Sequence, residues 1–405
     1  MWALAWRNIW RNRRRTVITL VAVGLNTAVL IVTYGLLSGI NEQLVRRATG
    51  LVVGDVQIHA AGYLADRSLY KDIPNPGALL RQADAQRWRA VARAYGVGLL
   101  AHAKKSAGAI FWGVDPGRER RAFRLASALA SGAFVDDESR SDGLGGVVLG
   151  GRLARSLDVG VGDELVAVVQ AADGSIGNAL FHVVGVLKSA GDDIDRGAAI
   201  LHHGDFERLF VSGGRIHEIA LRGPQSAGVV ASVFHLSPGL QAKTWREILP
   251  LLSDMLRLQG SLLWLFNLIF LLAAGLGVMN TMLMATHDRV REFGVLKALG
   301  AHPWRIMRDV ALEAWMLSAV ASSIGLGIGM AANFYFQRVG IDLTAVGGND
   351  LRFGGVAYEP IWRASVDAWG LLVCIGLMWV VCVVASLYPA IRVARLNPVA
   401  AMTHV

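Results

Sequence analysis

Four stretches of the chain are apolar and free of Asp, Glu, Lys and Arg, and they occupy residues 16–40, 261–286, 314–337 and 368–391. Each has 24 to 26 residues and is rich in Leu, Val, Ile, Ala and Gly. A helix of about 20 apolar residues crosses the roughly 30 Å of hydrocarbon in a bilayer. The pattern therefore predicts a membrane protein with four transmembrane helices, each long enough to span with some tilt.

The more than 200 residues between the first two apolar stretches have a different pattern, in which short strand-like runs alternate with helical periodicity. Strands are expected at residues 51–58, 109–114, 147–149, 164–169, 181–187 and 216–221. Helices are expected at residues 76–95, 152–158 and 205–210, and at residues 244–259, where the helix continues into the second apolar stretch. This segment predicts an α+β domain with its own core.

The distribution of charge predicts how the four helices are oriented across the membrane. The chain has a net charge of +9. The segments before the first stretch, between the second and third, and after the fourth together carry +8, whereas residues 41–257 carry +2 and residues 338–367 carry −1. Because Lys and Arg gather in cytoplasmic loops, both termini are expected in the cytoplasm and the α+β domain outside it. The basic balance thus indicates topology rather than a nucleic-acid partner.

Composition agrees with this organisation, since 54% of the 405 residues are hydrophobic, 18% are charged and the mean hydropathy is +0.43. Trp2, Trp6 and Trp10 recur every fourth residue and predict an interfacial helix before the first span. The first apolar stretch is too long for a signal peptide and is expected to remain as a span. The expected segments are 1–40 (interfacial helix and first span), 41–254 (extracytoplasmic domain), 255–286 (second span), 287–313 (cytoplasmic loop), 314–337 (third span), 338–367 (extracytoplasmic loop) and 368–405 (fourth span and cytoplasmic tail).

Residues that carry chemistry are scarce. The spans hold no carboxylate, His or basic residue, which argues against coupling to an ion gradient. No Walker A sequence occurs, and residues 192–195 lack the spacing of a calcium loop and predict a turn. Cys374 and Cys382 lie about 12 Å apart along a helix, too far for a disulfide. The histidines have no metal-binding spacing, so we expect no catalytic residue, no metal site and no cofactor in this chain.

The cytoplasmic loop contains a short amphipathic helix that can pass movement between a soluble partner and the spans. Val290, Phe293 and Leu296 share one face, Gly300 suits the left-handed position after its end, and Pro303 suits the first turn of the next helix. In the spans, two G-x-x-x-G patterns allow close helix approach, either within the chain or between subunits. The four glycines are Gly35, Gly39, Gly325 and Gly329.

The loop sequence from Arg289 through Glu292, Gly294 and Lys297 to Ala301 resembles the R-E-x-G-x-x-K-A-L-G-A loop of the FtsX/MacB/LolC-type ABC permeases, where it is the coupling helix that docks on the ATPase. The resemblance extends to residues 6–16, 54–58, 113–116, 148–163 and 388–398. It implies an ATPase-docking surface made of Arg289, Arg291, Glu292, Phe293, Gly294, Leu296, Lys297 and Gly300.

This resemblance also implies partners. ATP and Mg²⁺ are expected on an ATPase dimer formed by a separate chain, because no Walker A sequence occurs here. A second permease, identical or related, is expected in the complex, which would lie in the bacterial inner membrane.

In length and in the size of its outer domain, the chain is most similar to the lipoprotein-releasing LolC/LolE type. That resemblance implies extraction of lipoproteins from the membrane and their transfer to a periplasmic carrier or adaptor. The acyl chains are expected to enter between the first two spans, and the lining is expected to consist of Leu30, Tyr34, Leu37, Leu258, Leu262 and Leu265. MacB-like efflux of drugs or peptides and FtsX-like signalling to a cell-wall hydrolase remain alternatives.

Overall fold

The structure is a computed structural model that describes residues 10–11, 13–136, 145–188, 190–223, 236–342, 352–353, 356–357 and 361–395. The chain falls into two compact units, the first made of residues 1–42, 257–346 and 361–405 and the second of residues 43–256 and 347–360. The interfacial helix expected around Trp2 and Trp6 falls on residues 1–9, outside the described residues.

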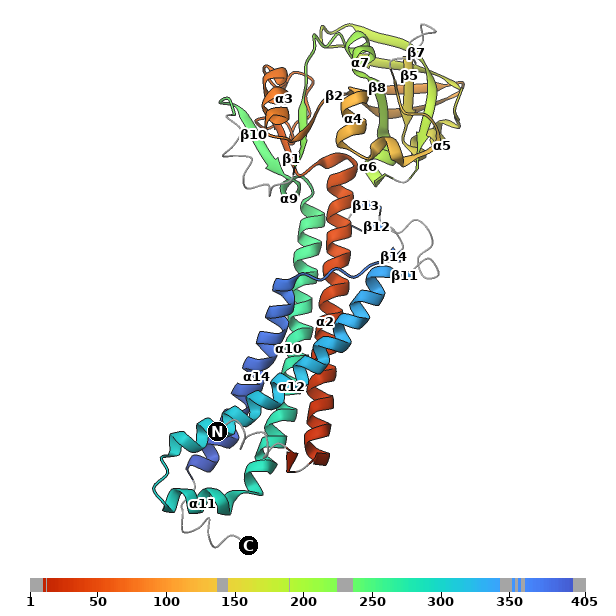
Figure 1. Cartoon of the computed structure of the whole chain (residues 1–405). Helices are drawn as coiled ribbons and strands as arrows, with labels where there is room; N and C mark the ends of the chain where they lie inside the picture. Colours follow the sequence, from red (N-terminus) through yellow and green to blue (C-terminus); the bar gives the residue numbers. More distant parts are fainter. Residues whose placement is uncertain are drawn as a thin grey trace. The chain divides into compact units, whose positions relative to one another are not determined.

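The first unit contains four long helices, which are α2 (Arg13–Ala48), α10 (Pro250–His287), α12 (Pro303–Arg338) and α14 (Ala368–Ala394) (Figure 1). Each contains one of the apolar stretches and is long and apolar enough to cross a membrane. The far end of α2 and the start of α10 belong to the second unit. In the described part of the chain, the candidate spans are therefore the four that the sequence predicts.

A shared apolar core joins these four helices. The buried cluster includes Val23 of α2, Val278 of α10, Ala321 of α12 and Met378 of α14. A few polar side chains bridge neighbouring helices, as the indole nitrogen of Trp379 does when it donates a hydrogen bond to the Ser322 hydroxyl at 2.8 Å. Two smaller elements complete the unit, the short helix α11 (Val290–Ala298) and the strand pair β11 (Ile341–Asp342) with β14 (Ile361–Trp362).

The described part of the second unit is built on a ten-stranded sheet. The strands are β1 (Val56–Ala60), β2 (Arg89–His102), β3 (Lys105–Val114), β4 (Leu129–Gly132), β5 (Gly145–Leu149), β6 (Glu164–Gln170), β7 (Ile176–Leu187), β8 (Ala198–His202), β9 (Glu218–Arg222) and β10 (Leu240–Thr244). They follow the order β10-β1-β9-β2-β3-β8-β5-β7-β4, and β6 pairs with both β2 and β7. Only the β3–β8 and β5–β7 pairs among these are parallel, so the domain is α+β, as predicted.

Short helices accompany this sheet. They are α3 (Pro76–Ala85), α4 (Pro116–Ala122), α5 (Gly151–Leu157), α6 (Asp192–Gly197), α7 (His203–Phe210) and α9 (Trp245–Ile248), with the π-helical turn η1 (Thr49–Val53) and the 3₁₀ turn η2 (Leu125–Ala128). Helix α7 packs on the sheet through Phe206 and Phe210, and the ring centroid of Phe210 lies 5.6 Å from that of Phe111 on β3. A short pair, β12 (Arg352–Phe353) and β13 (Val356–Ala357), completes the unit.

Three local predictions were wrong. The helix expected over residues 76–95 ends at Ala85, because Arg87 has a φ of +61° and strand β2 begins at Arg89, where it pairs with β9. Residues 51–53 are not strand but part of η1, and Gly54, with a φ of +74°, separates them from β1. Residues 192–195 form the start of α6 rather than a turn. In each case, pairing or packing with distant segments overrides local propensity.

Candidate functional site

Helix α11 forms where the amphipathic pattern predicts a helix in the cytoplasmic loop. Gly300 follows it with a φ of +87°, a conformation that favours glycine. The amide of Trp304 then donates to the His302 ring at 3.3 Å, which caps the start of α12 beside Pro303. A tight, capped turn of this kind fixes the angle at which α11 leaves α12.

The apolar residues of α11 are not equally covered. Phe293 is buried in a cluster with Ile306 and Val310 of α12 and Val393 of α14. Leu296 comes three residues later, which places it on the same side of the helix as Phe293, but it is about half exposed. The predicted apolar face is therefore only partly covered by the described residues.

Ion pairs hold the start of α11. Arg289 donates to Glu313 of α12 at 2.8 Å and to Glu292 at 3.0 Å, and Arg11 also donates to Glu292 at 2.5 Å. Partial burial acts to raise the pKa of Glu292, but the hydrogen bonds from Arg11 and Arg289 outweigh it and the pKa is lowered. Burial acts to lower the pKa of Arg289, and Glu313 outweighs it, so that this pKa is raised.

The other end of α11 is tied to α14. The ammonium group of Lys297 donates a hydrogen bond to the carbonyl oxygen of Ala394 at 2.8 Å, where α14 ends and carbonyl groups lack helical partners. Glu292 and Lys297, both expected to contact an ATPase, thus make contacts within the chain that fix α11 on the bundle.

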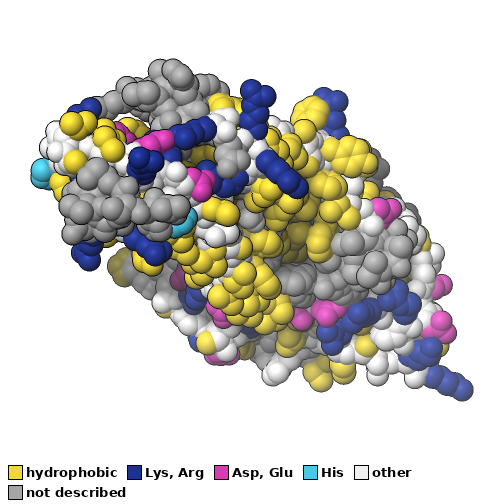
Figure 2. Space-filling model, turned by 90° about the horizontal axis from the view of Figure 1, so that it is seen from below, with side chains coloured by type: hydrophobic (Ala, Val, Ile, Leu, Met, Phe, Trp, Pro, Cys, Tyr) yellow, Lys and Arg dark blue, Asp and Glu magenta, His cyan; other side chains and the backbone are white. Residues whose placement is uncertain are grey.

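A second set of side chains is left exposed on the same loop. Leu299 is 80% exposed and Trp304 is 65% exposed, and Val295 and Leu296 are about half exposed. Figure 2, which looks onto the side of the first unit that carries α11, shows hydrophobic side chains gathered beside Lys and Arg side chains. Apolar groups exposed together at the end of a helix bundle are typical of a protein–protein contact.

The six side chains expected to line a substrate path do not share one environment. Leu30 is 3% exposed and packs in the core of the bundle. Tyr34 is partly buried and donates a hydrogen bond to Asp367 at 2.5 Å, and Leu37 is also partly buried. By contrast, the three leucines of α10 are about half exposed or more, namely Leu258, Leu262 and Leu265.

The four glycines of the G-x-x-x-G patterns lie where helices meet within the chain. A Cβ atom on Gly325 would collide with the backbone of Gly24 on α2, and one on Gly329 would stand 2.9 Å from the Cβ of Ile31. Gly35 faces Asn333, whose side chain donates to the Ile31 carbonyl at 2.9 Å. Gly39 lies against the backbone of residues 363–365. The patterns therefore shape the contacts of α2 with α12 and with the segment before α14.

The sequence patterns gave no indication of a buried charge cluster in the second unit. Arg93 of β2 is fully buried and makes two hydrogen bonds to Glu119 of α4, at 2.7 and 3.1 Å. It also donates to Glu218 of β9 at 2.9 Å and to the carbonyl of Val52 in η1 at 2.7 Å. Burial acts to lower the pKa of Arg93, and Glu119 outweighs it, so that the pKa is raised. The cluster joins the end of α2 to the sheet.

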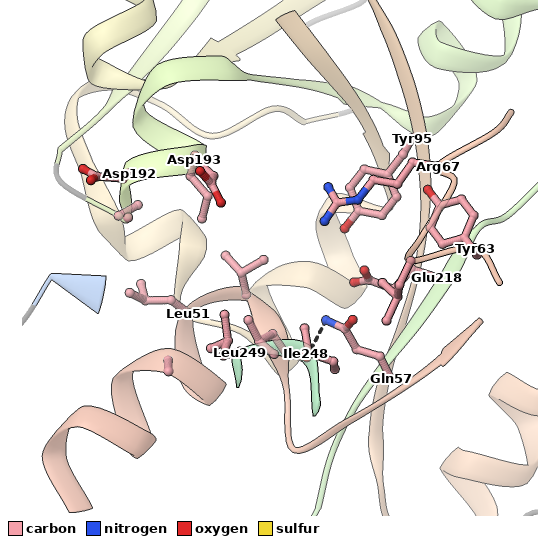
Figure 3. Close-up of a pocket in the computed structure, with 17 residues that line it drawn as sticks. Leu51, Gln57, Tyr63, Arg67, Tyr95, Asp192, Asp193, Glu218, Ile248 and Leu249 are labelled. Carbon is pink, nitrogen blue, oxygen red and sulfur yellow. Dashed lines mark hydrogen bonds between the residues drawn. The ribbon is translucent and has the colours of Figure 1, made fainter. Parts of the chain in front are cut away.

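A cavity of about 230 Å³ lies beside this cluster (Figure 3). Its lining comes from the end of α2 and η1, from β1 and the segment after it, from β2 and β9, from the start of α6 and from the end of α9. The stick view shows Glu218, Tyr63 and Arg67 on one side of the space and Asp192 and Asp193 on the other. All of these residues belong to the second unit.

Comparison with known protein families identifies the family of this chain. Residues 16–232 match the family described as MacB-like periplasmic core domain, and residues 264–398 match the one described as FtsX-like permease C-terminal. The chain belongs to the MacB/FtsX family of ABC transporter permeases. The first match covers most of the second unit, and the second covers α11, α12 and most of α10 and α14.

The chain is also similar to individual proteins. The chain is 26% identical over 98% of its length to the pyoverdine export ATP-binding/permease protein PvdT of Pseudomonas syringae pv. tomato, of which it covers 58%. It is 30% identical over 41% of its length to the macrolide export ATP-binding/permease protein MacB of Marinobacter nauticus, of which it covers 28%. It is 24% identical over 49% of its length to the ABC transporter permease YknZ of Bacillus subtilis, of which it covers 45%.

The family has a characteristic division of roles between a permease and an ATPase. MacB-family permeases are membrane proteins that work with an ABC ATPase, and the permease part is generally non-catalytic. The expectation of an FtsX-like permease with a MacB-like domain is confirmed at the level of the family. These comparisons do not show the LolC/LolE type specifically.

Proposed function

We propose that this permease is the membrane part of an exporter in which α11 and the first turn of α12 receive the movement of the ABC ATPase. The observation that carries the proposal is the combination of a fixed backbone with exposed apolar side chains. Arg289 and Lys297 fasten the two ends of α11 to α12 and α14, while Leu299 and Trp304 remain exposed. A rigid element with an exposed apolar surface can bind a partner and pass on its displacement.

The membrane orientation proposed for this exporter rests on charge. The excess of Lys and Arg in the segments that carry α11 and the two termini supports a cytoplasmic position for all three. The second unit would then lie outside the cytoplasm. The complex itself would lie in the bacterial inner membrane. We also propose that two permeases, identical or related, act with a pair of ATPase subunits.

Removal of the exposed apolar groups tests the docking role. We expect Leu299→Asp and Trp304→Ala to lower permease-stimulated ATP hydrolysis by about tenfold in the purified complex, because apolar anchors dominate such contacts. Val161→Asp is the matched control, since Val161 is an exposed apolar residue of the second unit. Wild-type stimulation in both docking variants would refute the proposed surface.

For the substrate, we propose lipoproteins that are released from the membrane and handed to a carrier. The half-exposed leucines of α10 support this, because an acyl chain needs an apolar helix surface beside the bilayer. Similarity to PvdT over 98% of the chain favours a second candidate, the export of a small molecule.

Depletion of the permease separates the two candidates. Lipoproteins that accumulate in the inner membrane fraction would support the first, and a sharpened sensitivity to small toxic compounds with unchanged lipoprotein localisation would support the second. Unchanged localisation and unchanged sensitivity would refute both.

A further inference from the structure

The cavity in the second unit is bounded by both apolar and charged groups. Leu51 of η1 together with Ile248 and Leu249 forms one apolar side, as Figure 3 shows. Glu218 and Tyr63 lie on another side. Ligand sites commonly combine apolar walls with a few convergent polar groups in this way, although drug-sized ligands occupy about 300–1,000 Å³. At about 230 Å³, this space suits a smaller molecule or a compact group.

The charge beside the cavity is unbalanced. One guanidinium, that of Arg93, is shared by two carboxylates, those of Glu119 and Glu218. The formal charge of the cluster is therefore −1. Arg93 and Glu119 are fully buried and Glu218 is only 6% exposed. A buried charge without a counter-charge is costly in free energy, so a cation that reaches Glu218 would be stabilised there.

Glu218 has an oxygen available for such a cation. Its Oε1 atom accepts from Arg93, whereas its Oε2 atom takes no hydrogen bond from the described residues. The side chain lines the cavity in the stick view. The Tyr63 hydroxyl lies on the same side and likewise makes no hydrogen bond within the described part of the chain, although the Tyr63 ring is stacked on His59, with the centroids 5.4 Å apart. These two groups offer acceptors to an N–H donor.

Other lining residues restrict what fits. Asp193 is exposed and adds a carboxylate on the opposite side. Arg67 lines the space on the same side as Glu218. Because Arg67 is exposed, water screens its charge, so it only partly offsets the buried carboxylates and disfavours a second positive charge on the ligand. The apolar side formed by Leu51, Ile248 and Leu249 favours a carbon body next to the charged group.

We propose that this cavity binds the ammonium group of a small, singly charged amphipathic molecule, with the ammonium on Glu218 and the apolar body against Leu51 and Leu249. A body of about ten non-hydrogen atoms suits this volume. The ammonium group could belong to a free amphiphile or to a lipid headgroup. This site is independent of whether α11 docks an ATPase.

Three matched probes test the charge requirement by titration calorimetry on the purified full chain. They are 2-phenylethylamine, 2-phenylethanol and 3-phenylpropanoate, which have similar bodies and different charges. We expect the amine to bind saturably and at least about tenfold more tightly than the alcohol or the acid, because a charge-assisted hydrogen bond to a buried carboxylate is strong. Absence of saturable amine binding, or equal binding of amine and alcohol, would overturn the proposal.

Variants test the location. Glu218→Gln keeps the shape and removes the negative charge, and it should weaken amine binding by at least about tenfold. Leu51→Phe narrows the apolar side, leaves the charge cluster unchanged and should also weaken amine binding. With two lining variants, a folding defect in one of them still leaves the location of the site testable. Asp173→Asn, at an exposed carboxylate outside the lining, is the control and should bind as the wild type does. Unaltered affinity in both lining variants would place the amine elsewhere and refute the site.

Nanodiscs distinguish the two sources of the ammonium group. If the ligand is a lipid headgroup, phosphatidylethanolamine discs should weaken 2-phenylethylamine binding compared with phosphatidylglycerol discs. If it is a free amphiphile, the two discs should give equal affinities. Either result supports the ammonium site, whereas loss of binding in both discs would contradict it.

Discussion

The Nη1 atom of Arg289 donates a hydrogen bond to Oε1 of Glu313 at 2.8 Å. Both side chains are mostly buried, with 18% and 10% of their surfaces exposed. This pair joins the residue before α11 to α12, and Lys297 joins the other end of the helix to α14. A force on α11 is therefore applied to two of the long helices at once.

Loss of the Arg289 side chain should loosen this attachment. Arg289→Ala leaves Glu313 largely buried without the guanidinium, and we expect a loss of stability of about 2 kcal/mol together with weaker stimulation of the ATPase. Thermal unfolding in detergent measures the first effect. Arg81→Ala, at an exposed arginine of α3 in the second unit, should change neither quantity. Equal behaviour of the two variants would show that the Arg289–Glu313 pair adds nothing.

Substitution of Gly300 should strain the turn after α11. Its φ of +87° is unfavourable for other residues, so Gly300→Ala is expected to cost about 1 kcal/mol. No atom of the described residues lies within 4 Å of the added methyl group, so the expected cost comes from the backbone conformation. Gly277→Ala in α10 also meets open space but lies in a helix, and its unfolding temperature should stay the same or rise. Identical melting of the two variants would contradict this account.

The seam between α2 and α12 gives a matched pair of substitutions on one helix. Gly325→Leu places a side chain against the backbone of Gly24 and should destabilise the bundle by about 1–3 kcal/mol. Gly327→Leu, two residues away, meets open space and should melt as the wild type does. The comparison uses the unfolding temperature of the full chain in one detergent. A stable Gly325→Leu variant would mean that α2 and α12 do not meet at this residue.

The second unit should lose stability in mild acid. Burial lowers the pKa of His217 from 6.5, and its ring accepts from the amide of Tyr95 and bonds to the carbonyl of Leu69, each at 3.0 Å. The folded state therefore binds fewer protons than the unfolded state. The stabilisation is fully present above about pH 6.5 and is lost as the pH falls through the folded pKa. Urea unfolding at pH 7.5 and 5.5 measures it.

His217→Asn isolates this contribution. Asparagine retains an acceptor for the Tyr95 amide but does not titrate in this range. We expect its stability to change less between pH 7.5 and 5.5 than that of the wild type. An unchanged pH dependence would assign the effect to other groups.

The sequence predicted the features that depend on local patterns of residues. Apolar length identified the four long helices, and Gly300 marked the end of α11 because only a few residues tolerate its backbone conformation. The helix predicted through Tyr95 was wrong because residues 89–102 pair with β3, which follows directly, and with β9, which lies far away in the sequence.

The buried cluster of Arg93, Glu119 and Glu218 could not be predicted from the sequence for the same reason. Arg93 and Glu218 are directly opposite each other in the β2–β9 pair, yet 125 residues separate them. A single arginine within the run Ala90-Val91-Ala92-Arg93-Ala94 is unusual, but no local pattern names its partners. The cavity beside it is lined by segments that lie far apart in the sequence, and it follows only from the tertiary structure.

The contact between α2 and the segment before α14 affects the order in which the chain folds during its synthesis. The amide of Ser365 donates to the carbonyl of Gly35 at 2.9 Å, and Gly39 lies against the backbone of Arg363. The two pairs are 330 and 324 residues apart, so the ribosome must have synthesised the whole intervening domain before they can meet. The last seam of the bundle therefore closes late, and a nascent chain that stops before residue 363 leaves the surface of Gly35 and Gly39 uncovered, which is a feature that quality-control proteases can recognise.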